Sequence, residues 1–214
     1  MRRCAKYFST PRAKNCYATH VPVLIGIARI REVRNVLEFG CGYYSTLTFL
    51  NAAVFPHLER LESVENDAAW AETINEIGKN DPRWTLNLVE GEISESVSTF
   101  DFEAFDLILI DDSETSDQRV RTIREFAKRP PHRPWIVIHD FEVEDYRRAA
   151  SGFRQTHRFK AYNPNTGLLW SNTTHARRAK AIDRIIKANA KTLEPDDIPR
   201  WQEAFAGFRS EFKL

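Results

Sequence analysis

Two glycines and a serine stand where the sequence could hold a small ligand. Gly40 and Gly42 directly follow the apolar run 35–39, and Ser45 comes three positions after the second glycine. Glycines let the chain turn tightly and let a ligand touch the backbone, because no Cβ stands in the way. Ser45 is a natural N-cap for a following helix, whose positive end favours a carboxylate or phosphate. These residues predict a ligand-binding loop.

Acidic residues and one histidine lie at the ends of other apolar runs. Glu65, Asp111 and His139 each end such a run, and Asp140 follows directly after His139. If the runs are parallel strands, their carboxyl ends meet at one edge of the sheet, where ligands collect. His139 or Asp140 could remove a proton from a substrate bound there. The sequence therefore predicts acid–base chemistry beside the glycine loop.

The elements that must position these residues alternate between short apolar runs and amphipathic stretches from residue 35 onward. This alternation is typical of strand–helix units around a parallel sheet. Continuous Val, Ile and Leu indicate strands that are buried on both faces. We expect strands at 35–39, 61–65, 85–89, 106–111 and 135–139. Helices are expected between them at 45–54, 68–79, 113–128 and 142–151, the second capped by Asn66 or Asp67.

The alternation of strands and helices ends after the fifth strand, where only residues 163–165 separate the runs 157–162 and 166–171. So short a connection predicts a β-hairpin, which makes the last pair of strands antiparallel. The fold class is therefore α/β. Further helices are expected at 21–30, 176–190 and 199–212. Apolar residues of the last two recur at helical spacing and are interpreted as core packing or a dimer face: Ile182, Ile185, Ile186, Trp201, Phe205 and Phe208.

The segment Glu38-Phe39-Gly40-Cys41-Gly42 resembles the first motif of class I S-adenosylmethionine-dependent methyltransferases, in which an acidic residue two positions before the first glycine is typical. Ser45-Thr46 is similar to a branch of that family in which Ser-Thr replaces the third glycine. The resemblance spans about residues 20 to 172. It implies a doubly wound, mainly parallel seven-stranded sheet of order 3-2-1-4-5-7-6, with the last strand antiparallel and helices on both faces.

The resemblance also implies how the loop would hold the methionine part of S-adenosyl-L-methionine, the expected cofactor. Glu38 would contact the ammonium side of that part. The loop and the start of the next helix would frame the same part with its carboxylate. The loop residues concerned are Gly40, Cys41, Gly42, Ser45 and Thr46.

Three further acidic residues would complete the cofactor site. Glu65 takes the place of the residue that binds both ribose hydroxyls, since one carboxylate can accept two such hydrogen bonds. Glu92 resembles the acidic residue near the adenine amino group, with Ile93 as an apolar wall, and Asp111 would face the mouth of the site. Two alternatives stay open, namely that Glu65 caps the following helix and that Glu92 is a solvated loop residue.

Methyl transfer is an in-line displacement, so the protein mainly positions the reactants, excludes water and removes a proton. His139 and Asp140 are the expected catalytic residues. In catechol-type O-methyltransferases, which this chain resembles in part, an Asp after strand 4 and an Asp-Asn pair after strand 5 bind magnesium. Asp112 and Asp140 are similar, but Phe141 stands in place of the Asn. We therefore expect no metal, with Asp112 and Asp140 as the weak candidates.

The net charge of +1 over 214 residues conceals a strong segregation. The segments 1–34, 35–117, 118–160 and 161–214 carry +7, −15, +6 and +3. The acidic segment holds the expected cofactor contacts, and its basic flanks favour a small anionic substrate. Nucleic acid stays open as a partner because aromatic residues stand within the basic stretches.

We expect three parts in the chain: an N-terminal basic segment with a helix (1–34), a Rossmann-like methyltransferase domain (35–172) and a C-terminal helical extension (173–214). The terminal helices could form a homodimer. No apolar run approaches the length of a membrane-spanning helix, so no membrane partner is expected. Three cysteines without a CxxC pair argue against a disulfide framework and against zinc, which makes a reducing cytoplasm the default compartment.

The leading hypothesis is a methyltransferase (EC class 2.1.1) that acts on an oxygen or nitrogen nucleophile. The first alternative is an NAD-dependent oxidoreductase, because Gly40-x-Gly42-x-x-Ser45 is a degenerate dinucleotide fingerprint with Glu65 as its ribose acid. The charge of Glu38 close to a pyrophosphate argues against it. The second alternative is a methyltransferase-like fold that serves as a non-catalytic binding or scaffold module.

Overall fold

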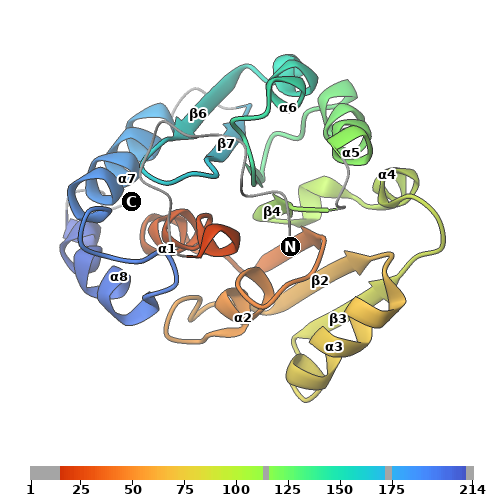
Figure 1. The fold of residues 1–214 in the computed structure, drawn as a ribbon, viewed down its shortest axis with the longest axis horizontal. Helices are drawn as coiled ribbons and strands as arrows, with labels where there is room; N and C mark the ends of the chain where they lie inside the picture. Colours follow the sequence, from red (N-terminus) through yellow and green to blue (C-terminus); the bar gives the residue numbers. More distant parts are fainter. Residues whose placement is uncertain (1–14, 113–115, 172–174, 211–214) are drawn as a thin grey trace.

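The computed structural model describes residues 15–112, 116–171 and 175–210, and seven strands within these ranges form one sheet (Figure 1). The sheet order is β3-β2-β1-β4-β5-β7-β6. Strands β1 to β5 are parallel, whereas β7 runs antiparallel to both β5 and β6. The predicted order and the antiparallel last strand are confirmed. The bounds are β1 (Asn35–Phe39), β2 (Arg60–Glu65), β3 (Trp84–Leu88), β4 (Leu107–Ile110), β5 (Trp135–Ile138), β6 (Gln155–Phe159) and β7 (Thr166–Trp170).

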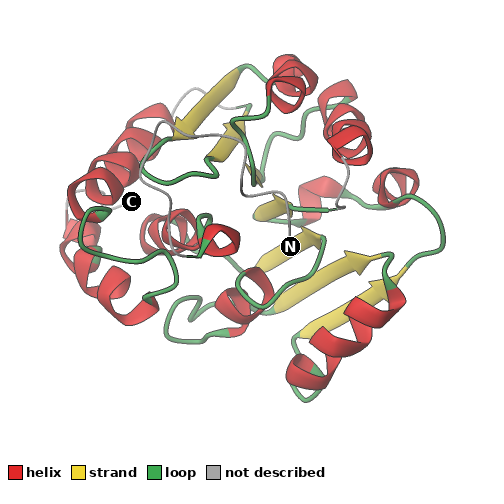
Figure 2. Cartoon of the chain, viewed as in Figure 1, coloured by secondary structure: helices red, strands yellow, loops and turns green. Residues whose placement is uncertain are grey.

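Helices surround the sheet, as the cartoon coloured by secondary structure shows (Figure 2). Asp67 caps α3 by accepting hydrogen bonds from the backbone of Ala69 and Trp70, which confirms one of the two predicted caps. The helices are α1 (Val21–Ile30), α2 (Ser45–Leu50), α3 (Ala68–Gly78), α4 (Ile93–Ser96), α5 (Ser116–Lys128), α6 (Glu144–Ala149), α7 (Ala176–Asn189) and α8 (Ile198–Ala204).

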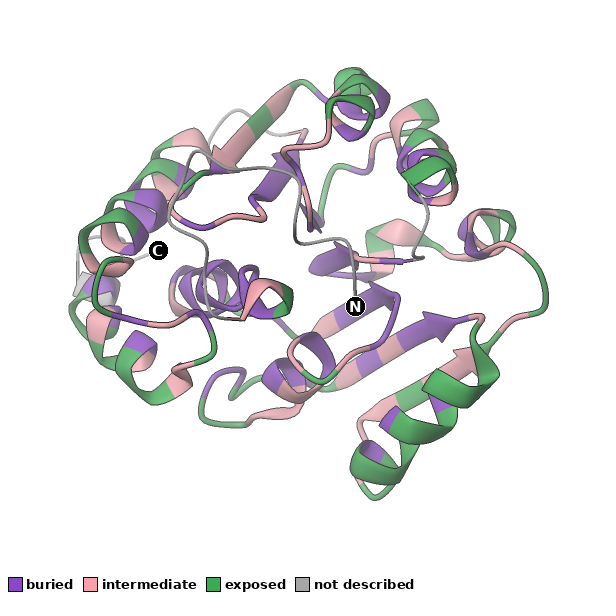
Figure 3. Cartoon of the chain, viewed as in Figure 1, coloured by how far each residue is buried: buried purple, intermediate pink, exposed green. Residues whose placement is uncertain are grey.

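The central strands are buried on both faces, as the purple strands in Figure 3 show. On β4, Leu107 and Leu109 pack into a core shared with α1, α7 and α8. Ile108 and Ile110 point to the opposite face and pack with α5. Successive strand side chains point to opposite sides, so an unbroken apolar run fits a strand that is covered twice.

Two connections and the last helix differ from the sequence prediction, since α8 ends at Ala204 instead of residue 212. Helix α2 ends at Leu50 instead of residue 54, because the side chain of Asn51 accepts a hydrogen bond from the backbone of Ala53 and competes with the helix. The β6–β7 connection spans residues 160–165 rather than 163–165, since β6 ends at Phe159. The side chain of Asn165 donates to the carbonyl of Tyr162 and closes this longer loop.

The apolar stripe of the last two helices packs inside the chain. Trp201 and Phe205 are fully buried in the core shared with α1, and α7 and α8 lie beside α1 (Figure 1). At Gly26 a Cβ would lie 2.7 Å from Ile182, so α1 and α7 approach closely. Core packing, one of the two expected explanations of the stripe, is thus confirmed. The homodimer stays a prediction and draws no support from these buried residues.

The cysteine interpretation needs a correction. Cys16 is disulfide-bonded, whereas Cys41 is free and buried. An odd count leaves room for one pair, so the argument from the cysteine count against disulfides is wrong for Cys16. The cysteine argument for a reducing compartment falls with it. Among the described helices, none has both the length and the apolar character needed to cross a bilayer.

Candidate functional site

Most of the site residues predicted from the sequence lie at the carboxyl edge of the sheet. Because β1, β2, β4 and β5 run parallel and are neighbours, the residues that follow their ends share this edge. These include the Gly40–Gly42 loop, Glu65, Asp111 and His139. The expected convergence of loop, carboxylates and histidine is therefore present.

The glycine loop packs directly against the end of β4. Gly40 has a positive φ of 85° and donates from its backbone to the carbonyl of Val64 at 2.9 Å. A Cβ at this position would lie 2.5 Å from the carbonyl oxygen of Asp111. Both the conformation and the close approach require glycine.

The start of α2 corrects one prediction. Ser45 is the first residue of the helix, and Tyr44 precedes it without a side-chain cap. The Oγ1 of Thr46 instead accepts a hydrogen bond from the backbone of Gly42 at 3.0 Å. The N-cap assigned to Ser45 is wrong because Ser45 is itself the first helical residue, as the range 45–54 predicts, and Tyr44 occupies the N-cap position.

Glu38 lies beneath the loop and is fully buried. Its Oε2 accepts hydrogen bonds from Thr46 at 2.8 Å and from Ser63 at 2.5 Å, while its Oε1 has no hydrogen-bond partner. Burial raises the pKa of Glu38 to about 7. Glu38 thus supports the loop through Thr46, and its contact with a ligand ammonium stays a prediction.

Replacing Glu38 by glutamine is expected to remove one pH dependence of stability. The folded protein holds the Glu38 proton up to about pH 7, whereas the ordinary pKa is 4.5, so the free energy of unfolding falls as pH rises through this interval. The fall due to Glu38 is on the order of 3 kcal/mol. Urea unfolding of both proteins between about pH 4 and 8 measures it as their difference. Parallel curves would show that Glu38 is already ionised in the folded protein.

One carboxylate oxygen of Glu65 faces the backbone that follows β2, and the other faces the glycine loop. Its Oε1 accepts hydrogen bonds from the backbone of Asn66 at 2.8 Å and Asp67 at 3.0 Å, and its Oε2 lies 3.7 Å from the Cys41 sulfur. Asp67, not Glu65, caps α3. Backbone donors hold Glu65 in place, which is the arrangement that a ribose-binding carboxylate needs.

Cys41 and Trp70 border Glu65. The indole nitrogen of Trp70 donates to the carbonyl of Cys41 at 2.7 Å, and its ring meets Tyr43 edge-on at 5.5 Å. Burial raises the pKa of the Cys41 thiol, so the thiol stays protonated and inert as a nucleophile. The partly exposed aromatic pair Tyr43–Trp70 therefore flanks the glycine loop.

Glu92 pairs with a residue of α5. Its carboxylate forms a two-bond ion pair with Arg121 at 2.5 and 2.6 Å, while Ile93 is buried in the core. The loop after β2 is linked to the loop after β3, because the side chain of Asn66 donates to the carbonyl of Gly91 at 2.7 Å. The ion pair favours the alternative in which Glu92 is a surface residue, and its contact with adenine stays a prediction.

A buried arginine that the sequence analysis did not single out lies at the centre of the site. The guanidinium of Arg119 contacts Asp111 at 2.9 Å and Asp140 at 3.0 Å, and its Nε lies 3.8 Å from a carboxylate oxygen of Asp112. Arg119 precedes the buried Ile123 by four positions on α5. A charge within an apolar helical stripe was the signal that could have found it.

The two weak magnesium candidates are already matched with this guanidinium. Burial raises the pKa of Asp112 to about 6, and its Oδ2 accepts a hydrogen bond from Thr122 at 2.5 Å. Asp140, whose φ is 56°, pairs with Arg119. Both carboxylates already have protein partners, and Phe141 supplies no side-chain oxygen at the position of the family's Asn, so these residues do not fit a magnesium site.

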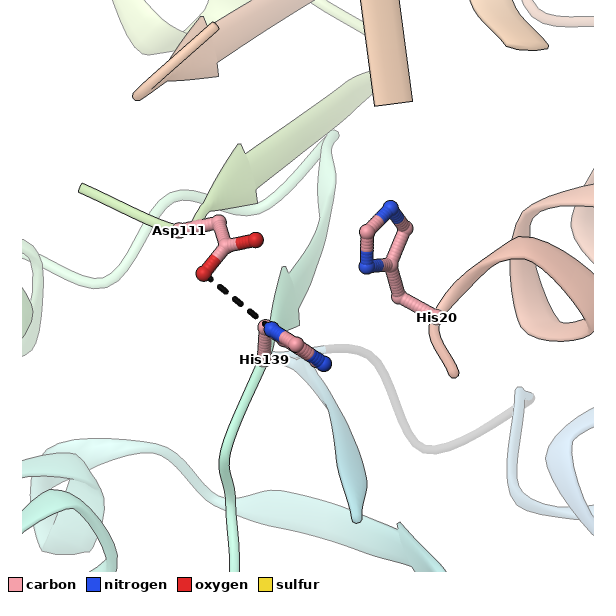
Figure 4. A group of neighbouring side chains, drawn as sticks. All are labelled: His20, Asp111 and His139. Atoms are coloured by element: carbon pink, nitrogen blue, oxygen red, sulfur yellow. Dashed lines mark hydrogen bonds and ion pairs between the residues drawn. The ribbon is translucent and has the colours of Figure 1, made fainter. Parts of the chain in front are cut away.

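His139 and His20 lie side by side next to Asp111 (Figure 4). His139 Nδ1 is 3.2 Å from Asp111 Oδ1, and its Nε2 is 2.9 Å from the hydroxyl of Thr19. The carboxylate of Asp111 raises the pKa of His139 to about 9 despite burial, whereas burial lowers the pKa of His20 to about 3. His20 and Thr19 precede α1, far from β4 and β5 in the sequence, so no local spacing could identify them.

A separate cavity of about 440 Å³ lies at the opposite edge of the sheet. Its lining includes Asp101 and Glu103, which precede β4, and Pro130 and His132, which precede β5. Residues before parallel strands lie at the amino edge, so this cavity is not part of the site above.

No protein-family profile matches the chain, and no curated protein resembles it in sequence. Solved structures do resemble it. A spermidine synthase in complex with the transition-state analogue AdoDATO is 16% identical with a TM-score of 0.57, covering 80% of this chain and 66% of its own. A precorrin-6y C5,15-methyltransferase from Geobacter metallireducens is 14% identical with a TM-score of 0.53, covering 76% of this chain and 94% of its own. The chain has the class I methyltransferase fold.

The O-methyltransferase TomG from Streptomyces achromogenes, solved in complex with SAM, shares this fold with a TM-score of 0.50, 16% identity and coverage of 72% and 80% of the two chains. The chain spans just under two thirds of the spermidine synthase. Because one neighbour is named a synthase and the others methyltransferases, the class I methyltransferase fold does not by itself decide which group is transferred.

Proposed function

We propose that this protein is an S-adenosylmethionine-dependent methyltransferase that acts on an oxygen or nitrogen nucleophile of a small molecule. The observation that carries the proposal is Glu65, buried at the end of β2 with its Oε1 held by two backbone amides. A carboxylate fixed in this way beside a glycine loop suits the two hydroxyls of an adenosyl ribose.

The other residues fit the same ligand. The Gly40–Gly42 loop exposes backbone without side chains, and Glu38, once ionised, would supply the negative charge that a cationic sulfonium ligand prefers. Tyr43 and Trp70 offer apolar ring surface beside Cys41. The ends of β4 and β5 border the acceptor side, where His139 is the group placed to accept or hold a proton, oriented by Asp111.

The acceptor is proposed to be a small anionic molecule. Its support is the charge pattern, in which the acidic segment 35–117 is flanked by basic segments at 1–34 and 118–160. Residues 1–14, which carry most of the positive charge of the segment 1–34, lie outside the described residues.

Calorimetry with S-adenosylmethionine, S-adenosylhomocysteine and NAD tests the proposal against its alternatives. The two adenosyl ligands are expected to bind at micromolar concentration and NAD to bind at least about ten-fold more weakly. A preference for NAD would favour the oxidoreductase, for which Glu65 is an equally suitable ribose acid. A protein that binds none of the three would contradict both enzyme hypotheses.

Replacing Glu65 by alanine is expected to weaken S-adenosylhomocysteine binding by about 10- to 100-fold. Hydrogen bonds to a charged carboxylate contribute roughly 1.5 to 3 kcal/mol, and a factor of ten is about 1.4 kcal/mol. The matched control is Glu62→Ala on the same strand, whose side chain pairs with Arg60 instead. Unchanged affinity in Glu65→Ala, with both variants folded, contradicts the ribose assignment.

A further inference from the structure

Three metal-binding side chains from distant parts of the chain meet on the acceptor side of the sheet. His20 stands at the start of α1, Asp111 at the end of β4 and His139 at the end of β5. One donor atom from each lies within 4.8 Å of the others. Figure 4 shows the three side chains at the corners of a triangle, each coming from a different element. The histidines are buried, whereas the Asp111 side chain is 22% exposed. The cluster is therefore open to solvent on the side of Asp111.

His20 is the unusual member of this cluster. It is 2% exposed, and neither of its ring nitrogens has a hydrogen-bond partner. Its ring lies edge-on to His139, with the centroids 4.9 Å apart. A buried polar group without a partner costs roughly 1 to 3 kcal/mol, so native proteins retain few of them. A neutral imidazole in this situation has a free lone pair, which is what a metal ligand offers.

The charges around the cluster favour a divalent cation. Three carboxylates, from Asp111, Asp112 and Asp140, lie within 4 Å of the single guanidinium of Arg119. When a bound cation replaces any proton on the imidazoles, the three carboxylates and the guanidinium leave an excess of two negative charges. An ion of charge +2 balances that excess.

We propose that His20, Asp111 and His139 bind a divalent transition-metal ion. Two imidazole nitrogens and one carboxylate oxygen suit Zn²⁺ and similar ions, whereas Mg²⁺ prefers oxygen ligands only. Three protein ligands leave at least one coordination position open, as in catalytic rather than structural zinc sites. The ion takes the place of the proton that His139 otherwise shares with Asp111.

A consequence that rests on the proposed function concerns the acceptor. The open position lies at the ends of β4 and β5, beside the glycine loop that contacts Asp111. An acceptor oxygen bound there would be held next to the cofactor site and would ionise more readily. Zn²⁺ binding by the three side chains does not depend on this consequence.

The experiment uses tag-free protein that is stripped with a chelator and titrated by calorimetry with ZnCl₂ and, in parallel, MgCl₂. The wild type is expected to bind one equivalent of Zn²⁺ at micromolar concentration or tighter, and Mg²⁺ at least about 100-fold more weakly. His20→Ala and His139→Gln are each expected to lose at least about ten-fold in Zn²⁺ affinity. His57→Ala, which removes an exposed histidine, is the control and is expected to match the wild type.

Equal Zn²⁺ affinity in His20→Ala, His57→Ala and wild type would overturn the proposal, because binding would then be adventitious at the surface. Absence of Zn²⁺ binding by the folded wild type would overturn it too. Circular dichroism checks folding, and His20→Gln replaces His20→Ala if the latter is unfolded. Substitution with Co²⁺ gives a second readout, since the visible absorption of bound Co²⁺ reports imidazole ligation and is expected to disappear in His139→Gln.

The same variants separate this site from the cofactor site. His20→Ala is expected to bind S-adenosylhomocysteine like the wild type, because His20 does not belong to the glycine loop or to Glu65. A protein that binds Zn²⁺ through His20 but binds no adenosyl ligand would retain the metal site and contradict the methyltransferase proposal. The reverse result would contradict the metal site alone.

Discussion

Replacing Arg119 by methionine is expected to lower the free energy of unfolding by about 3 to 5 kcal/mol at neutral pH. The variant keeps most of the side-chain volume but removes the charge that faces Asp111, Asp112 and Asp140. Arg119 is only 4% exposed, so water cannot replace it as a partner for these carboxylates. Urea unfolding in the presence of a chelator measures the loss without interference from bound metal.

The control for this prediction is two residues away on the same helix. Arg121 also pairs with a carboxylate, Glu92, but its side chain is 46% exposed. Arg121→Ala is therefore expected to cost less than about 1 kcal/mol. If Arg119→Met were equally mild, the three carboxylates would have to be protonated or otherwise neutralised in the wild type, and the charge argument for a metal ion at Asp111 would lose its basis.

The fold was predictable because local patterns and the layered architecture agree. The run 107–110 is apolar at every position, and in the structure its side chains fill two cores on opposite faces of β4. Such a run has little alternative to a central strand. Element ends were less predictable, because side-chain hydrogen bonds decide them. Asn51 ends α2 through its bond to Ala53, which no periodicity of apolar residues reveals.

The site was predictable where its residues follow strands and not where they come from helices. Glu65, Asp111 and His139 were found because parallel strands bring their ends together. Arg119 reaches the same edge from α5, and His20 reaches it from the segment before α1. Their proximity depends on how each helix packs on the sheet, which is a tertiary property. Sequence spacing did not reveal Arg119, so the pairing of Asp112 and Asp140 with this residue could not be predicted either.

Replacing Gly40 by alanine is expected to destabilise the protein by about 2 to 4 kcal/mol and to weaken S-adenosylhomocysteine binding by at least about 100-fold. The positive φ of 85° strains any residue with a Cβ. The new methyl group would lie 2.5 Å from the carbonyl oxygen and 2.7 Å from the carbonyl carbon of Asp111. Since both atoms are backbone, the glycine loop and the end of β4 must move apart. Thermal unfolding and calorimetry measure the two losses.

Gly42→Ala separates the two reasons for glycine in this loop. Gly42 has no positive φ, and its nearest contact would be the hydroxyl of Ser45 at an ordinary 3.5 Å. Stability is therefore expected to change by less than about 1 kcal/mol. If the loop holds a ligand against its backbone, the added methyl group still obstructs that ligand, and affinity falls by at least about ten-fold. A stable Gly42→Ala variant with unchanged affinity would mean that Gly40 serves the fold alone and that the ligand lies elsewhere.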